Sequence, residues 1–173
     1  MFDEKIVKKA IKGNDKAFII LMNQCKEQIY RTAFAYVKEE EMALDIVQEV
    51  VCRAYKSIEN LKEPKFFNTW IMRIAINIST DFYNKKIKVV CMEQDELISK
   101  MEVKHDDNDV RLFLMESLDN LEEKYKKIII LKYFDDLTFK DIAEILSMPE
   151  STVKTNLYKG LSILRNDMKK EII

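Results

Sequence analysis

Glycine and proline are nearly missing from this chain, which contains only two residues of each type among its 173 residues. An all-β fold needs many tight turns, and such turns depend heavily on these two residue types. Segments in which apolar and polar residues alternate, as in a half-buried strand, are also almost absent. Apolar residues instead recur every three or four positions over long stretches. These features exclude an all-β fold and favour an all-α fold.

Cysteine and histidine are also scarce. The three cysteines, Cys25, Cys52 and Cys91, lie far apart without a CxxC pair, and the one histidine, His105, lies in an acidic stretch. A structural zinc site needs four cysteine or histidine ligands at characteristic spacings, so we expect no metal site. An odd number of isolated cysteines does not suit a disulfide framework. The cytoplasm, where thiols stay reduced, is therefore the expected location.

Long apolar runs, a basic leader and catalytic motifs are absent as well. No run approaches the roughly 20 apolar residues of a membrane-spanning helix. The sequence begins with Met, Phe and two acidic residues, where a signal peptide would be basic. We therefore expect no membrane insertion. Without a glycine-rich phosphate loop, a nucleophile elbow or a metal cluster, we expect neither an enzyme nor a cofactor.

The strongest pattern that is present lies near the C-terminus and predicts a helix-turn-helix. Thr138 is a good N-cap, and Asp141 three residues later completes a weak capping box. The helical pattern breaks around Pro149, which suits the first turn of a second helix. The apolar positions then recur on one face of each helix: Ile142, Ala143 and Leu146 on the first, and Val153, Leu157, Leu161, Leu164 and Met168 on the second.

The opposite face of the second helix has the chemistry of a reader of the DNA major groove. Short hydrogen-bonding side chains alternate there with ammonium groups, which suit base edges and phosphates. Residues 150–170 contain five basic and two acidic side chains, a local charge of +3, whereas the whole chain has a net charge of −1. The alternative interpretation is an αα-hairpin with an ordinary solvated face. The candidate DNA contacts are Ser151, Thr152, Lys154, Thr155, Asn156 and Lys159.

Four further helices are expected before residue 86. The first is short and ends at Gly13, the second begins at Asn14 or Asp15 and runs to about Val37, the third opens at residues 39–41, and the fourth ends near Lys85. Residues 87–109 lose the helical periodicity and change from basic to acidic. We therefore predict two small helical domains, residues 1–86 and 110–173, joined by a flexible linker of residues 87–109.

Three separate segments resemble bacterial sigma factors of the extracytoplasmic-function group, which is group 4 of the sigma-70 family. Residues 43–50, A-L-D-I-V-Q-E-V, resemble the helix of that family that binds core RNA polymerase. Residues 66–77, with Trp70, Arg73 and Asn77, resemble its promoter-melting segment. Residues 138–146 and 151–154 resemble its second conserved domain. The resemblance covers nearly the full chain and implies a region 2-like helical bundle followed by a region 4-like helix-turn-helix.

The resemblance assigns a role to each set of polar residues. It implies an alternative sigma factor, in which the first domain binds the β′ clamp of core polymerase and the −10 element, and the second binds the β flap and the −35 element. The candidate core-polymerase contacts are Asp45, Gln48, Glu49 and Arg53. The candidate −10 contacts are Lys62, Lys65, Asn68, Arg73, Asn77 and Lys85. The −35 contacts are the residues of the second helix named above.

Other partners and rival functions follow from the same patterns. The resemblance implies an anti-sigma factor as an additional partner, and the lack of a dimerisation domain predicts a monomer when free. Two rival functions remain: a stand-alone helix-turn-helix transcription regulator and a polymerase-binding adaptor. Two departures from the family pattern concern the second domain. Ser147 replaces a glycine at the turn, and Gly160 replaces an alanine within the second helix, at a cost of up to about 1 kcal/mol.

Overall fold

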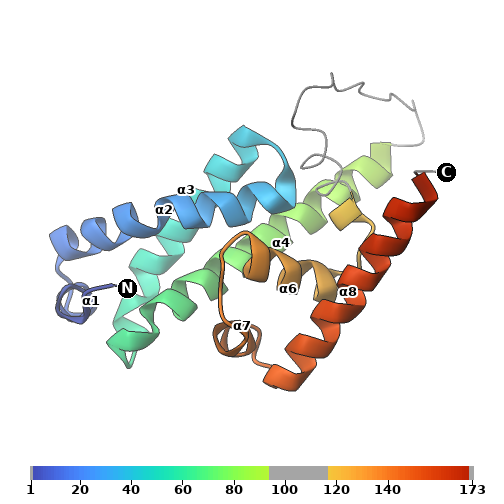
Figure 1. Ribbon diagram of the computed structural model, residues 1–173. Coiled ribbons are helices and arrows are strands. Elements are labelled where there is room, and N and C mark those ends of the chain that lie inside the picture. Colours follow the sequence, from blue (N-terminus) through green and yellow to red (C-terminus); the bar gives the residue numbers. More distant parts are fainter. Residues whose placement is uncertain (1, 94–116, 172–173) are drawn as a thin grey trace.

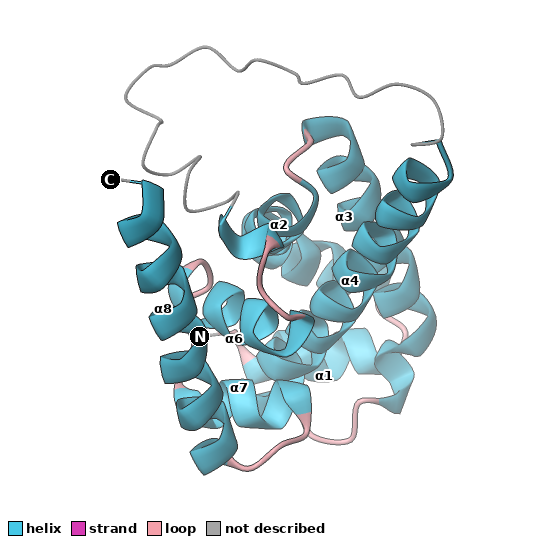
Figure 2. Cartoon of the chain, turned by 90° about the vertical axis from the view of Figure 1, so that its right-hand side faces the viewer, coloured by secondary structure: helices cyan, strands magenta, loops and turns pink. Residues whose placement is uncertain are grey.

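The computed structural model describes residues 2–93 and 117–171, with side chains for residues 2–86 and 117–166. Every regular element in these ranges is a helix, which confirms the all-α prediction. The helices form two lobes that lie side by side in both views of the molecule (Figures 1 and 2). We call residues 2–93 the N-terminal lobe and residues 117–171 the C-terminal lobe.

The N-terminal lobe is a bundle whose helix starts are set by side-chain caps. Asp3 accepts a hydrogen bond from the backbone N–H of Lys5 at 2.8 Å, and Asn14 accepts one from that of Ala17 at 2.9 Å. Gly13, with a φ of 85°, makes the turn between the first two helices. The elements are α1 (Glu4–Ile11), α2 (Asp15–Val37), α3 (Glu40–Ser57), the 3₁₀ turns η1 (Ile58–Asn60) and η2 (Pro64–Phe66), and α4 (Phe67–Glu93).

The core of this lobe consists of the helix faces that the apolar periodicity predicted. Each large aliphatic side chain that it removes from water contributes about 1.5–3 kcal/mol. The fully buried members include Leu21, Cys25, Ile29, Ala33, Ala43, Ile46, Val50, Ala54, Ile71 and Ala75.

Helix α4 is longer than predicted. It runs to Glu93, past the expected end near Lys85. The reason lies in the composition, because no glycine or proline occurs between Pro64 and Pro149 to stop a helix. The first residues of the expected linker therefore belong to α4. Its remainder, including His105 and the acidic residues 106–109, lies outside the described residues.

The C-terminal lobe contains the predicted helix-turn-helix. Its helices are α6 (Glu123–Tyr133), α7 (Phe139–Leu146) and α8 (Glu150–Glu171). The capping box is present, because Thr138 and Asp141 exchange hydrogen bonds with each other's backbone N–H groups, both at 3.2 Å. The turn after α7 places Ser147 in the left-handed region, at a φ of 53°. The inner face of α7 differs slightly from the prediction, since Ile145 is buried and Ala143 only half-buried.

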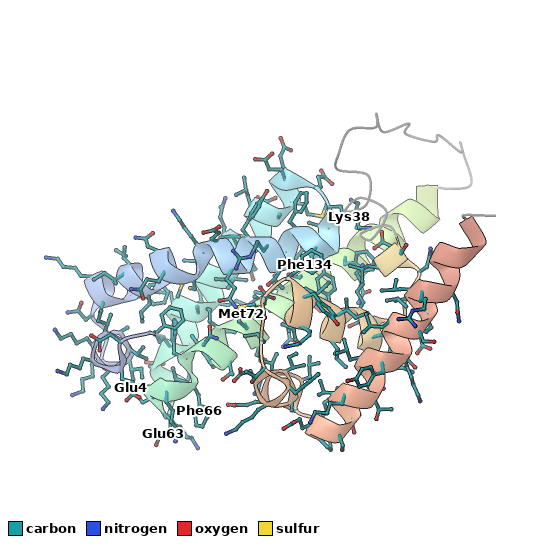
Figure 3. The ribbon with its side chains drawn as sticks, viewed as in Figure 1. Glu4, Lys38, Glu63, Phe66, Met72 and Phe134 are labelled. Carbon is teal, nitrogen blue, oxygen red and sulfur yellow. The ribbon has the colours of Figure 1, made fainter. Side chains whose placement is uncertain are left out.

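The two lobes pack directly against each other, a contact about which the sequence made no prediction. Helix α4 lies between α2 and α3 on one side and α7 on the other, and α6 touches α2. Met72, labelled in Figure 3, lies one helical turn from Thr69, which contacts α7, and Met72 is fully buried. Helix α4 therefore contributes to the packing of both lobes, while a polar strip that includes Asn77 and Asp81 stays exposed.

Among the described helices, none combines the length and the apolar character needed to cross a lipid bilayer.

Candidate nucleic-acid interface

The predicted DNA-reading face of α8 is exposed. Ser151, Thr152, Lys154, Thr155 and Lys159 are exposed, and Asn156 is half-buried. The Lys154 ammonium lies 2.7 Å from the Glu150 carboxylate and 5.3 Å from the centre of the Phe139 ring. Exposed ion pairs of this kind are weak, so a phosphate can replace the carboxylate at little cost. The structure therefore brings the predicted −35 set together on one solvent-facing surface.

Helix α8 is held in place by a close approach to α6. A Cβ atom at Gly160 would lie 3.0 Å from the Cδ1 atom of Ile129 and 3.1 Å from the Cβ atom of Tyr125. Gly160 is therefore not simply a weak helix former, because it lets the two helices come nearer than an alanine would. Val153 and Leu157 are buried on the same side, and this fixes the polar face outward.

The acidic face of α3 is also exposed. Asp45, Gln48 and Arg53 are exposed and Glu49 is half-buried, so none of them belongs to the bundle core. Arg53 donates a hydrogen bond from Nε to Glu49 at 2.7 Å, one helical turn away. The face is thus a preformed polar strip supported from beneath by Ile46 and Val50.

The predicted −10 residues lie at the start of α4 and along it, but they do not form one free surface. Lys62, Lys65, Asn77 and Lys85 are exposed, and Asn68 is half-buried. Of the nearby aromatics, Phe67 is fully buried and packs edge-on against Phe2, so it is a core residue. Phe66 is 39% exposed at the edge of the lobe (Figure 3), with the Lys65 ammonium 4.9 Å from its ring centre. Phe66 is thus the aromatic ring available to an outside partner.

Arg73 differs from the rest of the predicted −10 set because the C-terminal lobe already engages its guanidinium. Its Nε donates to the carbonyl oxygen of Ile145 at 3.0 Å, and a terminal nitrogen donates to that of Glu144. The Thr69 hydroxyl oxygen, one turn away, lies 3.2 Å from the Glu144 carboxylate and 3.0 Å from the Phe66 carbonyl oxygen. The carbonyls of Glu144 and Ile145 end α7, where a cation interacts favourably with the helix dipole. Arg73, although exposed, therefore caps α7 with two of its three guanidinium nitrogens while the lobes are packed together.

Sequence reasoning missed a polar cluster that joins the lobes. The Lys126 side chain is 2% exposed, and its ammonium lies 2.7 Å from Asp119 and 3.6 Å from the centre of the Tyr83 ring. Lys38, labelled in Figure 3, and the Tyr83 hydroxyl also donate to the Asp119 carboxylate. We call Lys38, Tyr83, Asp119 and Lys126 the Asp119 cluster. Lys38 and Tyr83 lie 81 and 36 positions from Asp119 in the chain, so no local pattern could have revealed the whole cluster.

Burial and pairing shift the pKa values within this cluster. Burial lowers the pKa of Lys126, and the nearby Asp119 charge only partly opposes this. Burial alone would raise the pKa of Asp119, but the hydrogen bonds from Lys126 and Lys38 hold it below its ordinary value. Burial also raises the pKa of Tyr83 to about 12. The Asp119 cluster thus joins the lobes through one carboxylate that two lysine ammonium groups and a tyrosine hydroxyl share.

Comparisons with known proteins match each lobe separately. The family described as Sigma-70 region 2 matches residues 21–88, and the family described as Sigma-70, region 4, matches residues 113–164. The RNA polymerase sigma factor SigV of Bacillus subtilis is 38% identical over 161 residues, covering 92% of this chain and 96% of the relative. The ECF RNA polymerase sigma factor SigW of the same organism is 32% identical, covering 98% of both chains.

A solved structure shares the fold across both lobes. It is the sigma factor RpoE in complex with the anti-sigma factor NepR from Bartonella quintana, which superposes with a TM-score of 0.70. The match covers 89% of this chain and 98% of that chain, at 18% sequence identity.

Proposed function

This chain belongs to the extracytoplasmic-function group of the sigma-70 family of RNA polymerase sigma factors, and we propose that it binds core polymerase through α3 and recognises promoters through α4 and α8. The observation that carries the proposal is the arrangement of three polar faces. An acidic strip on α3, a basic and polar set on α4 and an exposed reading face on α8 lie within or beside the two family matches. Transcription initiation is the function of the family, so any catalysis belongs to the polymerase.

The proposed division of the chain follows from those faces. Residues 1–86 would bind the polymerase and the −10 element, residues 110–173 would bind the −35 element, and residues 87–109 would link them. Helix α4 carries part of that link as far as Glu93.

On α3, Asp45, Gln48, Glu49 and Arg53 would contact the β′ clamp. Support comes from their position, since polar side chains on an exposed strip can be replaced without loss of the core and are free to bind. The β flap would bind the C-terminal lobe.

Lys62 and Lys65, just before α4, and Asn68, Asn77 and Lys85 on α4 would lie along the −10 element once the strands separate. Cations beside an exposed aromatic ring suit unstacked bases, and Phe66 supplies such a ring next to Lys65. Arg73 would join this set only after it leaves α7.

On α8, Lys154 and Lys159 would bind phosphates or guanine edges, while Ser151, Thr152, Thr155 and Asn156 would contact bases or backbone. The free protein should bind DNA weakly, because the net charge is only −1 and the −10 and −35 faces are not held at promoter spacing.

The remaining partners follow from the same assignment. We propose that an anti-sigma factor restrains the protein, because a relative of the same fold is found in complex with one. We also propose that the chain is a monomer when free and acts in the cytoplasm, where polymerase and chromosome are.

Reconstitution with purified core polymerase tests the function. The chain should start transcription at defined sites, and permanganate footprinting should show open thymines within the −10 element. The double variant Lys62→Ala, Asn68→Ala should reduce opening, whereas Lys16→Ala, an exposed lysine near the start of α2, should not. Tight specific DNA binding by the free chain without gain from core would favour the stand-alone regulator. Core binding without initiation would favour the adaptor.

A further inference from the structure

A buried carboxyl group lies in the seam between the lobes. Asp135, in the turn between α6 and α7, is 7% exposed, and its Oδ2 atom lies 2.7 Å from the Thr32 hydroxyl oxygen on α2. The two residues are 103 positions apart, one in each lobe. The other carboxyl oxygen, Oδ1, is buried and has no hydrogen-bond partner among the described residues. An ionised carboxylate held in this way is costly, because its Oδ1 atom is shielded from solvent and accepts no hydrogen bond from the described residues.

The hydrogen bonds around Thr32 indicate where the proton lies. The Thr32 hydroxyl oxygen is also 3.1 Å from the backbone carbonyl oxygen of Gln28, which can only accept. A hydroxyl has one proton and cannot donate to the Gln28 carbonyl and to an ionised Asp135 together. Both contacts are satisfied if Thr32 donates to Gln28 and a protonated Asp135 donates to Thr32. The geometry therefore favours a neutral Asp135 carboxyl when the two lobes are packed together. We call this packed state the closed arrangement and a state with the lobes apart the open one.

The charges that face Asp135 do not overcome its burial. On α2, Arg31 is the cation whose field reaches it, but this side chain is 44% exposed and lies 3.5 Å from Glu27. The adjoining cleft, with a volume of about 710 Å³, is lined by one further cation, Lys65, and by three other acids, Glu4, Asp136 and Asp141. Burial raises the pKa of Asp135 from its ordinary 3.8 to about 7, against the opposing effects of a hydrogen bond from Thr32 and of the Arg31 charge.

We propose that closure of the two lobes takes up a proton at Asp135, so that the closed arrangement is a proton-linked state of the free protein. The proton uptake itself does not depend on the proposed function. Only its consequence for promoter binding, the release of Arg73 when the lobes open, rests on that function. In the closed state Arg73 caps α7 and is withheld from the −10 set, and opening releases it.

The direction of the pH effect follows from the proton count in the two states. The closed state holds a proton up to a pH of about 7, while an exposed Asp135 in the open state would lose it near 3.8. Protonation of Asp135 therefore stabilises the closed state fully below about pH 4. This stabilisation decreases as the pH rises toward 7 and is lost above that. Between pH 5.5 and 8 the ratio of open to closed molecules should rise by about 30-fold.

Energy transfer between the lobes tests the proposal. One dye would occupy the exposed Cys52 on α3, and the other an introduced Ser162→Cys on the exposed side of α8. Cys91→Ser would remove a competing thiol, and His105→Gln a group that titrates in the same range. In this labelled parent protein, the ratio of open to closed molecules should rise by about 30-fold from pH 5.5 to 8. Asp135→Asn, a neutral isostere, should abolish that pH dependence, whereas the exposed neighbour Asp136→Asn should retain it.

A second measurement keeps the proposal testable if Asp135→Asn fails to fold. The carboxyl carbon of Asp135 can be followed by NMR in protein labelled with ¹³C-aspartate, and it should titrate with a midpoint near 7. Titration near 4 would overturn the proposal, as would energy transfer that does not change with pH or a pH response unaltered by Asp135→Asn. Neither readout uses polymerase or DNA, so failure here and failure of the proposed function are distinguishable.

Discussion

Replacing Lys126 by alanine should lower the stability of the protein more than replacing any exposed lysine would. The ammonium is 2.7 Å from Asp119 and 3.6 Å from the Tyr83 ring centre, and the side chain is 2% exposed. A buried pair that loses one partner costs about 3–5 kcal/mol. A desolvated cation–π contact is worth about 2 kcal/mol.

The Asp119 side chain moderates this loss. It is 37% exposed and keeps its bond to Lys38, so the lower end of the range applies and the loss should be about 3 kcal/mol. For a chain of this size, that corresponds to a fall in Tm of about 6–12 °C.

Thermal and urea unfolding at pH 6 measure the effect, with energy transfer between the lobes recorded in parallel. Lys124→Ala is the matched control, because that lysine is an exposed residue of the same helix and should change stability hardly at all. Lys126→Met retains the apolar stem, so the difference between the methionine and alanine variants separates packing from charge. If Lys126→Ala and Lys124→Ala lowered Tm equally, the Asp119 cluster would not hold the lobes together.

Three further predictions concern separate parts of the chain. Asp45→Ala with Glu49→Ala should sharply weaken binding to core polymerase in a titration while Tm barely changes, and Glu59→Ala, another exposed acid, should leave binding intact; unchanged affinity in the double variant would contradict the role of α3. Ser147→Gly should raise the free energy of unfolding by about 1 kcal/mol, because a left-handed residue at a φ of 53° is strained unless it is glycine. Urea unfolding measures this change, and a lower free energy of unfolding in the variant would contradict the prediction. In a Cys91→Ser background at pH 8, the exposed Cys52 should react with a thiol reagent at once, whereas Cys25 should react only on unfolding, because burial raises the pKa of Cys25 to about 12. Equal reaction rates of the two thiols would contradict the burial of Cys25 in the N-terminal lobe.

The features predicted correctly from sequence are those that neighbouring residues determine. Asn14, Gly13 and the Thr138 capping box act within one helical turn, so their residue types suffice to place the helix ends. The exposure of the α3 and α8 polar faces follows from the same helical periodicity.

The features that sequence reasoning missed depend on pairs distant in the chain. Asp135 meets Thr32 over 103 positions, and Arg73 meets Glu144 over 71. A lysine among several, or an acid in an acidic turn, carries no local sign that it will be buried. The packing of the two lobes against each other was not predicted for the same reason, because its contacts join residues far apart in the chain, such as Arg73 and Glu144.

The capping of α7 by Arg73 also affects how well ordered the end of α7 is. Helix α7 has only eight residues, too few to be stable by itself, and Arg73 of the other lobe donates to the carbonyls of Glu144 and Ile145, the first of which also accepts from the Ser147 N–H. When the lobes part, those carbonyls return to water and the end of α7 frays more often. The amide hydrogens of the turn around Ser147 and Met148 would then exchange faster with solvent in the open form. If the C-terminal lobe binds a −35 duplex as proposed, part of that binding free energy would go into restoring the order of α7.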